Sequence, residues 1–184
     1  ASLVLDGEEP DRVLFVGQAA PGEATAWAAT CDVRIGALRL STGIVEWTME
    51  LGPVLGFRSA GALSGRNSQL YVWTAHELRR VEGASGRTLW SRPLDDDAHA
   101  AGTQVQGDLT GEGVASALVP RASGNLDLVS GADGRTIWSA RVRTGPGIYR
   151  RDGQVLGDAP RLFVPNAEGL TALDMKTGAV LWAV

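Results

Sequence analysis

Short runs of apolar and β-branched residues alternate with polar, glycine-containing segments along the whole chain. Such runs are typical of β-strands, which favour β-branched and aromatic residues and are bounded by turn residues. Apolar residues do not recur at the three-to-four spacing of an amphipathic helix over any long window. The pattern therefore predicts an all-β protein.

One ten-residue pattern occurs four times. It consists of an apolar residue, a polar turn that contains glycine, a short apolar run and a tryptophan, and it spans Leu38–Trp47, Val81–Trp90, Val129–Trp138 and Leu173–Trp182. The spacings between successive tryptophans are 43, 48 and 44 residues. A constant period of that length is typical of repeat architectures, in which each repeat is one supersecondary unit.

A glycine stands four residues before the tryptophan in every copy. These glycines are Gly43, Gly86, Gly134 and Gly178, and each follows a Thr, Ser or Asp. Glycine supplies the positive φ of a tight hairpin turn, and the preceding polar side chain can bond to the local backbone. Each copy therefore predicts a β-hairpin with a buried tryptophan on its second strand, at Trp47, Trp90, Trp138 and Trp182.

Two more strands are predicted before each hairpin. The nearer strands are Val13–Val16, Leu70–Trp73, Ala117–Val119 and Leu162–Val164, and the weaker, more distant ones are Ser2–Leu5, Arg58–Ala62, Thr103–Gln106 and Gln154–Leu156. Four short strands in a repeat of about 45 residues describe one blade of a β-propeller. The chain is thus expected to be a single propeller segment over residues 1–184, with four four-stranded blades at about 1–52, 53–94, 95–143 and 144–184.

The repeat resembles that of the quinoprotein-like (PQQ-like) β-propeller family, which reads as an apolar strand, Ala-Leu-Asp, two residues, Thr-Gly, three residues and Trp. The fourth copy matches closely, with Ala172-Leu173-Asp174, Thr177-Gly178 and Trp182. The other three copies depart at the Asp position, where this chain has Arg39, Glu82 and Ser130. The resemblance implies a propeller fold, and since such propellers usually have seven or eight blades, it implies that these four are part of a larger ring.

An arc of four blades would leave apolar faces on its first and last blades. Val13, Phe15, Val164 and Trp182 are on the strands of those two blades. Since an exposed sheet edge and an uncovered repeat face invite association, the segment is expected to be stable only when it closes on itself, dimerises, or docks to the remaining blades of its propeller or to another protein.

A second resemblance concerns the loop Gly107–Gly113, which is similar to the calcium-binding loop of integrin-type (FG-GAP) propeller repeats. Alternating oxygens at Asp108, Thr110 and Glu112 would be the ligands. Ser116 stands where that loop usually has a further Asp. Hard cations such as Ca²⁺ prefer several carboxylate oxygens, so the expected Ca²⁺ affinity is weak or absent, and a glycine-stabilised turn is the alternative interpretation.

Composition narrows the functional classes. The net charge is −4, which argues against nonspecific nucleic-acid binding. The chain has no run of about 18 apolar residues that would span a membrane. It also lacks the catalytic serine, zinc-peptidase, phosphate-loop and dinucleotide motifs. Cys31 is the only cysteine, so it cannot supply the vicinal cysteine pair that quinoprotein enzymes often use against their cofactor.

We therefore expect a non-enzymatic β-propeller without catalytic residues or a cofactor, which acts as a protein–protein interaction scaffold. It would be an ectodomain or a subunit of a larger assembly, in an extracytoplasmic location (secreted, periplasmic or at the cell surface). Two alternatives remain. The chain could be a fragment of a quinone-cofactor dehydrogenase whose catalytic blades lie elsewhere, or a propeller that binds a carbohydrate or another ligand.

Overall fold

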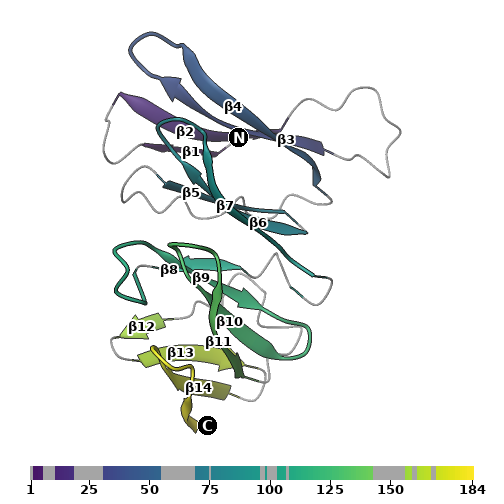
Figure 1. The fold of residues 1–184 in the computed structure, drawn as a ribbon, viewed down its shortest axis with the longest axis vertical. Coiled ribbons are helices and arrows are strands. Elements are labelled where there is room, and N and C mark those ends of the chain that lie inside the picture. Colours follow the sequence, from purple (N-terminus) through teal and green to yellow (C-terminus); the bar gives the residue numbers. More distant parts are fainter. Residues whose placement is uncertain are drawn as a thin grey trace. The chain divides into compact units, whose positions relative to one another are not determined.

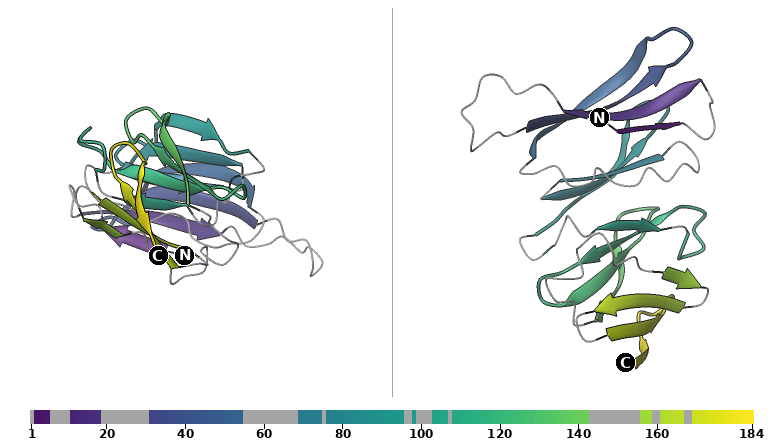
Figure 2. Two further views of the ribbon diagram at one scale, coloured as in Figure 1. Left: turned by 90° about the horizontal axis from the view of Figure 1, so that it is seen from below. Right: turned by 180° about the vertical axis from the view of Figure 1, so that it is seen from behind.

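A computed structural model describes residues 2–5, 11–18, 31–54, 69–74, 76–95, 98, 103–106, 108–142, 156–158, 161–166 and 169–184. All regular secondary structure within these ranges is β-strand. The chain divides into two compact units, Ala1–Ser91 and Arg92–Val184. Figure 1 labels the strands, and Figure 2 shows them from two other sides.

The first unit contains two antiparallel sheets. One has the order β1-β2-β3-β4, and the other, within the described residues, has the order β5-β6-β7. The strands are β1 (Ser2–Leu5), β2 (Arg12–Gln18), β3 (Cys31–Arg39), β4 (Val45–Val54), β5 (Gln69–Trp73), β6 (Glu77–Glu82) and β7 (Thr88–Pro93).

The second unit contains two four-stranded antiparallel sheets, β8-β9-β10-β11 and β12-β13-β14-β15. Their strands are β8 (Gln104–Gln106), β9 (Ser116–Pro120), β10 (Asn125–Val129), β11 (Thr136–Arg141), β12 (Leu156–Asp158), β13 (Arg161–Asn166), β14 (Gly169–Asp174) and β15 (Val180–Ala183). In all four sheets neighbours in sequence are neighbours in space, as expected of an up-and-down meander (Figure 1).

The predicted all-β class is confirmed, and most of the predicted strands are present. The predicted strand Arg58–Ala62 of the second repeat lies outside the described residues. In the fourth repeat the described first strand is Leu156–Asp158, whereas Gln154 and Val155 of the predicted strand Gln154–Leu156 lie outside the described residues. This strand pairs with β13, with Leu156 opposite Phe163 and Asp158 opposite Arg161.

The last two strands of each sheet are joined by one kind of turn. The backbone N–H of the turn glycine donates to the carbonyl of the residue four positions earlier, at 2.8 Å for Gly43 and Arg39 and at 3.0 Å for Gly134 and Ser130. The φ angles of Gly43, Gly86, Gly134 and Gly178 lie between 68° and 76°. Since L-residues rarely adopt this left-handed conformation, glycine sets both the turn and the bulge that follows it.

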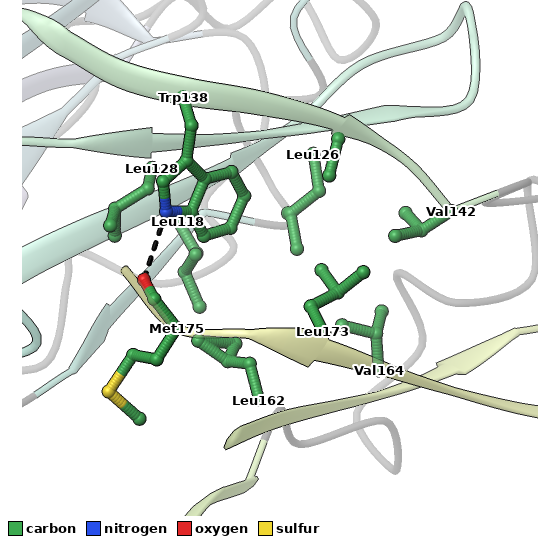
Figure 3. Packing of buried hydrophobic residues seen from close by; sticks show 10 residues of the cluster. Leu118, Leu126, Leu128, Trp138, Val142, Leu162, Val164, Leu173 and Met175 are labelled. Atoms are coloured by element: carbon green, nitrogen blue, oxygen red, sulfur yellow. Dashed lines mark hydrogen bonds between the residues drawn. The ribbon is translucent and has the colours of Figure 1, made fainter. Parts of the chain in front are cut away.

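Each unit has its own hydrophobic core between its two sheets. In the first unit Ile35 of β3 packs with Leu70, Val72 and Val81 of the neighbouring sheet. In the second unit the core joins apolar residues of β9, β10 and β11 to those of β13 and β14, including Leu118, Leu126, Leu128, Leu162, Val164 and Leu173 (Figure 3). The sheets therefore pack face to face through side chains that alternate along their strands.

Candidate functional site

The four repeat tryptophans occupy equivalent positions. Trp47, Trp90, Trp138 and Trp182 are each the third residue of the last strand of their sheet, in β4, β7, β11 and β15. Their surroundings differ, because Trp138 is buried, Trp47 and Trp90 are half-buried, and Trp182 is 40% exposed. The expectation of a buried tryptophan in every copy is therefore wrong for Trp182.

In the second unit Trp138 joins one sheet to the next. Its indole N–H donates to the carbonyl of Met175 at 3.0 Å, and the ring lies over Gly178 (Figure 3). A Cβ atom built on Gly178 would approach Cδ2 and Cε3 of the ring to 2.6 and 2.7 Å, closer than side chains tolerate. The ring thus occupies the volume that any other residue at position 178 would need.

Trp47 makes the same contact in the first unit. Its indole N–H donates to the carbonyl of Gly83 at 2.8 Å, and its ring lies over Gly86, where an added Cβ would approach Cδ2 and Cε3 to 2.6 Å. In both units the accepting carbonyl stands three residues before the covered glycine. We call this arrangement of ring, glycine and carbonyl the tryptophan contact.

Two hairpins do not form this contact within the described residues. The last hairpin has the tryptophan but covers no turn glycine, and the first hairpin has the turn glycine but no ring covers it. On β15, Trp182 contacts Phe163 of its own sheet, with ring centroids 6.0 Å apart, and all four residues of β15 are exposed. On the first hairpin, a Cβ built on Gly43 meets nothing within 4 Å. Every large apolar side chain that is exposed in the described part of the chain lies in or beside these two hairpins, at Leu40, Ile44, Val45, Val180, Leu181, Trp182 and Val184.

The hairpin turns differ in the residue whose side-chain oxygen accepts hydrogen bonds from the backbone of the turn. In the fourth repeat Asp174 accepts bonds from the backbone N–H of Lys176 and Thr177 and from the Thr177 hydroxyl at 2.8–3.1 Å. The Thr177 hydroxyl and then its N–H lower the pKa of Asp174. In the third repeat the Ser130 hydroxyl accepts from the turn amides of Ala132 and Asp133. The departure from Asp at that position is thus compatible with the same turn.

In the first repeat the accepting side-chain oxygen belongs to a residue outside the hairpin, in the connection before β2. Arg39 occupies the Asp position, and the carboxylate of Asp11, which lies just before β2, accepts bonds from the Ser41 backbone N–H at 2.7 Å and the Ser41 hydroxyl at 2.5 Å. Arg39 itself pairs with Glu46 and with Asp11. Sequence reasoning did not find Asp11, because the residue that serves the turn is about 30 positions away from it.

The structure brings the predicted calcium ligands Asp108, Thr110 and Glu112 into one loop. The carboxylate of Asp108 accepts four backbone N–H bonds from residues 110–113 at 2.7–3.1 Å. Glu112 accepts from the hydroxyls of Thr110 at 3.0 Å and Ser130 at 2.8 Å. In the described part of the chain no three His, Cys, Asp or Glu side chains converge as metal ligands, and the Ca²⁺ site stays a prediction.

No pattern in the sequence predicted the cluster of charged side chains at the third sheet. Asp127 of β10 is 5% exposed and accepts two bonds from the guanidinium of Arg121, at 2.7 and 2.9 Å. Arg121 also pairs with Asp95. A buried carboxylate is tolerated when a guanidinium compensates its charge and its lone pairs. The cluster has a structural explanation and needs no ligand.

No family model matches this sequence, and no curated protein matches it. Among solved structures, the chain is similar to BamB from Moraxella catarrhalis, with a TM-score of 0.59 and 19% identity over 91% of this chain and 47% of that one. It is also similar to a europium-containing methanol dehydrogenase, with a TM-score of 0.52 and 12% identity over 99% of this chain and 43% of that one.

The fold is that of β-propeller blades. The predicted propeller is confirmed by four antiparallel sheets that match propeller structures over most of the chain. The chain spans less than half the length of either propeller protein. The quinoprotein-like repeat stays a resemblance in sequence, and nothing in the comparisons supports the integrin-type resemblance of the loop at Asp108. In the described part of the chain, no helix is long and apolar enough to cross a membrane.

Substitution of Gly178 by Ala should cost more stability than the same change at another positive-φ glycine. Gly111 has a φ of 78° against 71° for Gly178, but an added Cβ at Gly111 meets nothing within 4 Å. Backbone strain should therefore cost about 1–2 kcal/mol in both variants. Collision with the Trp138 ring should add about 1–3 kcal/mol in Gly178→Ala alone. Urea unfolding measures both, and equal costs would contradict the tryptophan contact.

Acid should destabilise the loop at Asp108. Desolvation raises the pKa of Asp108, but the N–H groups of Gly113, Gly111, Thr110 and Glu112 together lower it below the usual 3.8. A carboxyl group with a depressed folded-state pKa stabilises the protein above its unfolded pKa and loses that effect as the pH falls through the folded value. Asp108→Asn should therefore melt with a weaker dependence on pH below about pH 4. Thermal midpoints that fall equally with pH in both proteins would refute this.

Proposed function

We propose that this chain is a non-enzymatic β-propeller segment that acts as a protein–protein interaction scaffold, as an ectodomain or as a subunit of a larger assembly. The observation that carries the proposal is the exposed apolar surface of the first and last hairpins, which includes Trp182 at 40% and Ile44 at 61% exposure. Each of these hairpins exposes several apolar side chains of its own, and a patch of exposed apolar surface on a folded protein is typical of a binding site for another protein. Aromatic residues such as tryptophan often supply much of the binding free energy.

The sequence of the outer strands supports this proposal. The two residues after the turn glycine are polar and exposed in the middle repeats, as Arg87-Thr88 and Arg135-Thr136. In the first and last repeats the same positions hold Ile44-Val45 and Ala179-Val180, which are exposed as well. An outer strand of this fold can therefore carry polar residues where it faces water. The apolar residues at the two ends are what a surface covered by a partner would need.

Photo-cross-linking in the cells that produce the protein tests the scaffold role. A photoreactive amino acid at Leu181, which is 48% exposed on β15, should form a covalent adduct with a protein. The matched control is position Thr136, an exposed residue on the corresponding strand β11, which should give no adduct. The absence of a protein adduct at position 181, or equal adducts at both positions, would contradict the proposal.

A second candidate function is that of a fragment of a quinone-cofactor dehydrogenase. It is favoured by the fold similarity to the europium-containing methanol dehydrogenase. The sequence supplies one cysteine, Cys31, where the family resemblance calls for a vicinal pair against the cofactor. We therefore favour the scaffold role, and the extracytoplasmic location remains a sequence-based prediction.

The purified protein should take up no pyrroloquinoline quinone, whether Ca²⁺ or a lanthanide ion is supplied with it. It should also fail to reduce a redox dye when an alcohol is added. Equilibrium dialysis measures the uptake, and an apo quinoprotein dehydrogenase serves as the positive control for both assays. Stoichiometric uptake together with alcohol-dependent dye reduction would favour the dehydrogenase and overturn the non-enzymatic assignment.

A further inference from the structure

The strand β15 is the outer strand of the fourth sheet, and within the described residues it pairs with β14 alone. Leu170 and Val184 form a hydrogen-bonded pair between the two strands, because the N–H of each donates to the carbonyl of the other at 2.8–2.9 Å. Such pairs alternate with non-hydrogen-bonded pairs along an antiparallel ladder, and the next pair joins Thr171 to Ala183. The backbone N–H and carbonyl of Ala183 therefore point away from β14, toward the open edge of the sheet.

The residue that follows the repeat tryptophan distinguishes this edge from those of the other three sheets. In β4, β7 and β11 this residue is polar and exposed, whereas in β15 it is Ala183, which is exposed as well. The three polar residues are Thr48, Ser91 and Ser139.

The same difference holds over the five residues centred on each tryptophan. In β4, β7 and β11 at least two of these five residues are polar, and they include the charged residues Glu46 and Arg92. In β15 and the residue after it, all five are apolar: Val180, Leu181, Trp182, Ala183 and Val184. Proteins usually protect an open edge strand with charged side chains or proline. An uncharged strand of residues with high β-propensity and no proline is suited to pair with a further strand.

We propose that the open edge of β15 binds an extended segment of another protein, which adds a fifth strand to the fourth sheet. A carbonyl of that segment accepts a hydrogen bond from the N–H of Ala183, and an N–H of the segment donates to the Ala183 carbonyl. The paired residues of the segment are uncharged, because their side chains lie beside those of Trp182 and Val184. The inference rests on the proposed scaffold role and specifies the form in which the partner binds.

The backbone groups at this edge favour an extended segment over other apolar occupants. An amphipathic helix could cover the side chains of Leu181 and Trp182, which are 48% and 40% exposed. The backbone N–H and carbonyl groups of a helix, however, are bonded to each other within the helix. An extended segment instead presents both groups at the spacing of the ladder, so it satisfies the backbone of Ala183 and covers the apolar side chains at once.

Selection of a phage-displayed library of random peptides on the purified protein tests the inference. The selected peptides should carry runs of uncharged β-branched and aromatic residues without proline. Ala183→Pro removes the outward N–H without removing a bond to β14, and it should raise the dissociation constant of a selected peptide about 10-fold or more. Ala183→Ser is the matched control, since it keeps the N–H and introduces the residue that β7 and β11 have at this position. It should change the constant less than about 3-fold.

N-methylation of a selected peptide gives a second measurement, which does not depend on how Ala183→Pro folds. Methyl groups on alternate residues block the N–H groups along one edge of the extended peptide and leave its side chains unchanged. One of the two alternate sets should raise the dissociation constant about 10-fold or more, and the other set should change it less than about 3-fold. The amide proton of Ala183 should also become protected from hydrogen exchange when the unmodified peptide is bound.

A library that yields no binding peptide would overturn the inference, as would peptides whose affinity is unaffected by both sets of methyl groups. A wild type that self-associates and becomes monomeric as Ala183→Pro would show that a second copy occupies the edge, and would overturn the assignment to another protein.

The photo-cross-linker at Leu181 separates this inference from the scaffold role. An adduct with another protein that persists in Ala183→Pro would leave the scaffold role standing and contradict strand addition. An adduct that is lost in Ala183→Pro and retained in Ala183→Ser would support both.

Discussion

The packing of neighbouring sheets in this chain depends on an indole that lies over a glycine. A tryptophan buried between two sheets stabilises the fold more when its N–H finds an acceptor, because an unpaired buried donor is destabilising. The hairpin turn of the next sheet supplies that acceptor as a backbone carbonyl, at Gly83 for Trp47 and at Met175 for Trp138. The turn glycine meets two requirements with one residue: it adopts the positive φ that the turn needs, and it leaves the space that the ring fills.

Because the contact joins one repeat to the next, it has a direction. Within the described residues no indole covers Gly43, Trp182 is 40% exposed, and the exposed large apolar residues lie in or beside these two hairpins. The surface that holds blades together inside the chain is chemically the same as the surface proposed to hold a partner. A scaffold role therefore requires no site beyond the repeat itself, and the charged cluster at Asp127 is explained as a structural feature.

Much of the fold could be predicted from the sequence, because the glycine-to-tryptophan pattern repeats at a nearly constant spacing and each copy encodes a local hairpin. The positions of the outer strands and turns follow from residues close together in the chain. The burial of each tryptophan could not be predicted in this way, because it depends on contacts with a neighbouring sheet that the local pattern does not encode. Trp182 thus looks like Trp138 in sequence and differs from it in exposure. The part played by Asp11 in the first turn was also hidden, since its partner Ser41 is distant in the sequence.

Hydrogen exchange at the indole nitrogens, followed by NMR, tests the tryptophan contact most directly. If the contact joins the sheets, the indole protons of Trp47 and Trp138 should exchange only when the sheets that they join separate. The Trp47 proton should be protected like the backbone amides of β3 and β6, and the Trp138 proton like those of β10 and β14. If both protons exchange at the rate of a solvent-exposed indole while those backbone amides remain protected, the indole–carbonyl bonds do not hold the sheets together, and the explanation of the fold given by the tryptophan contact is wrong.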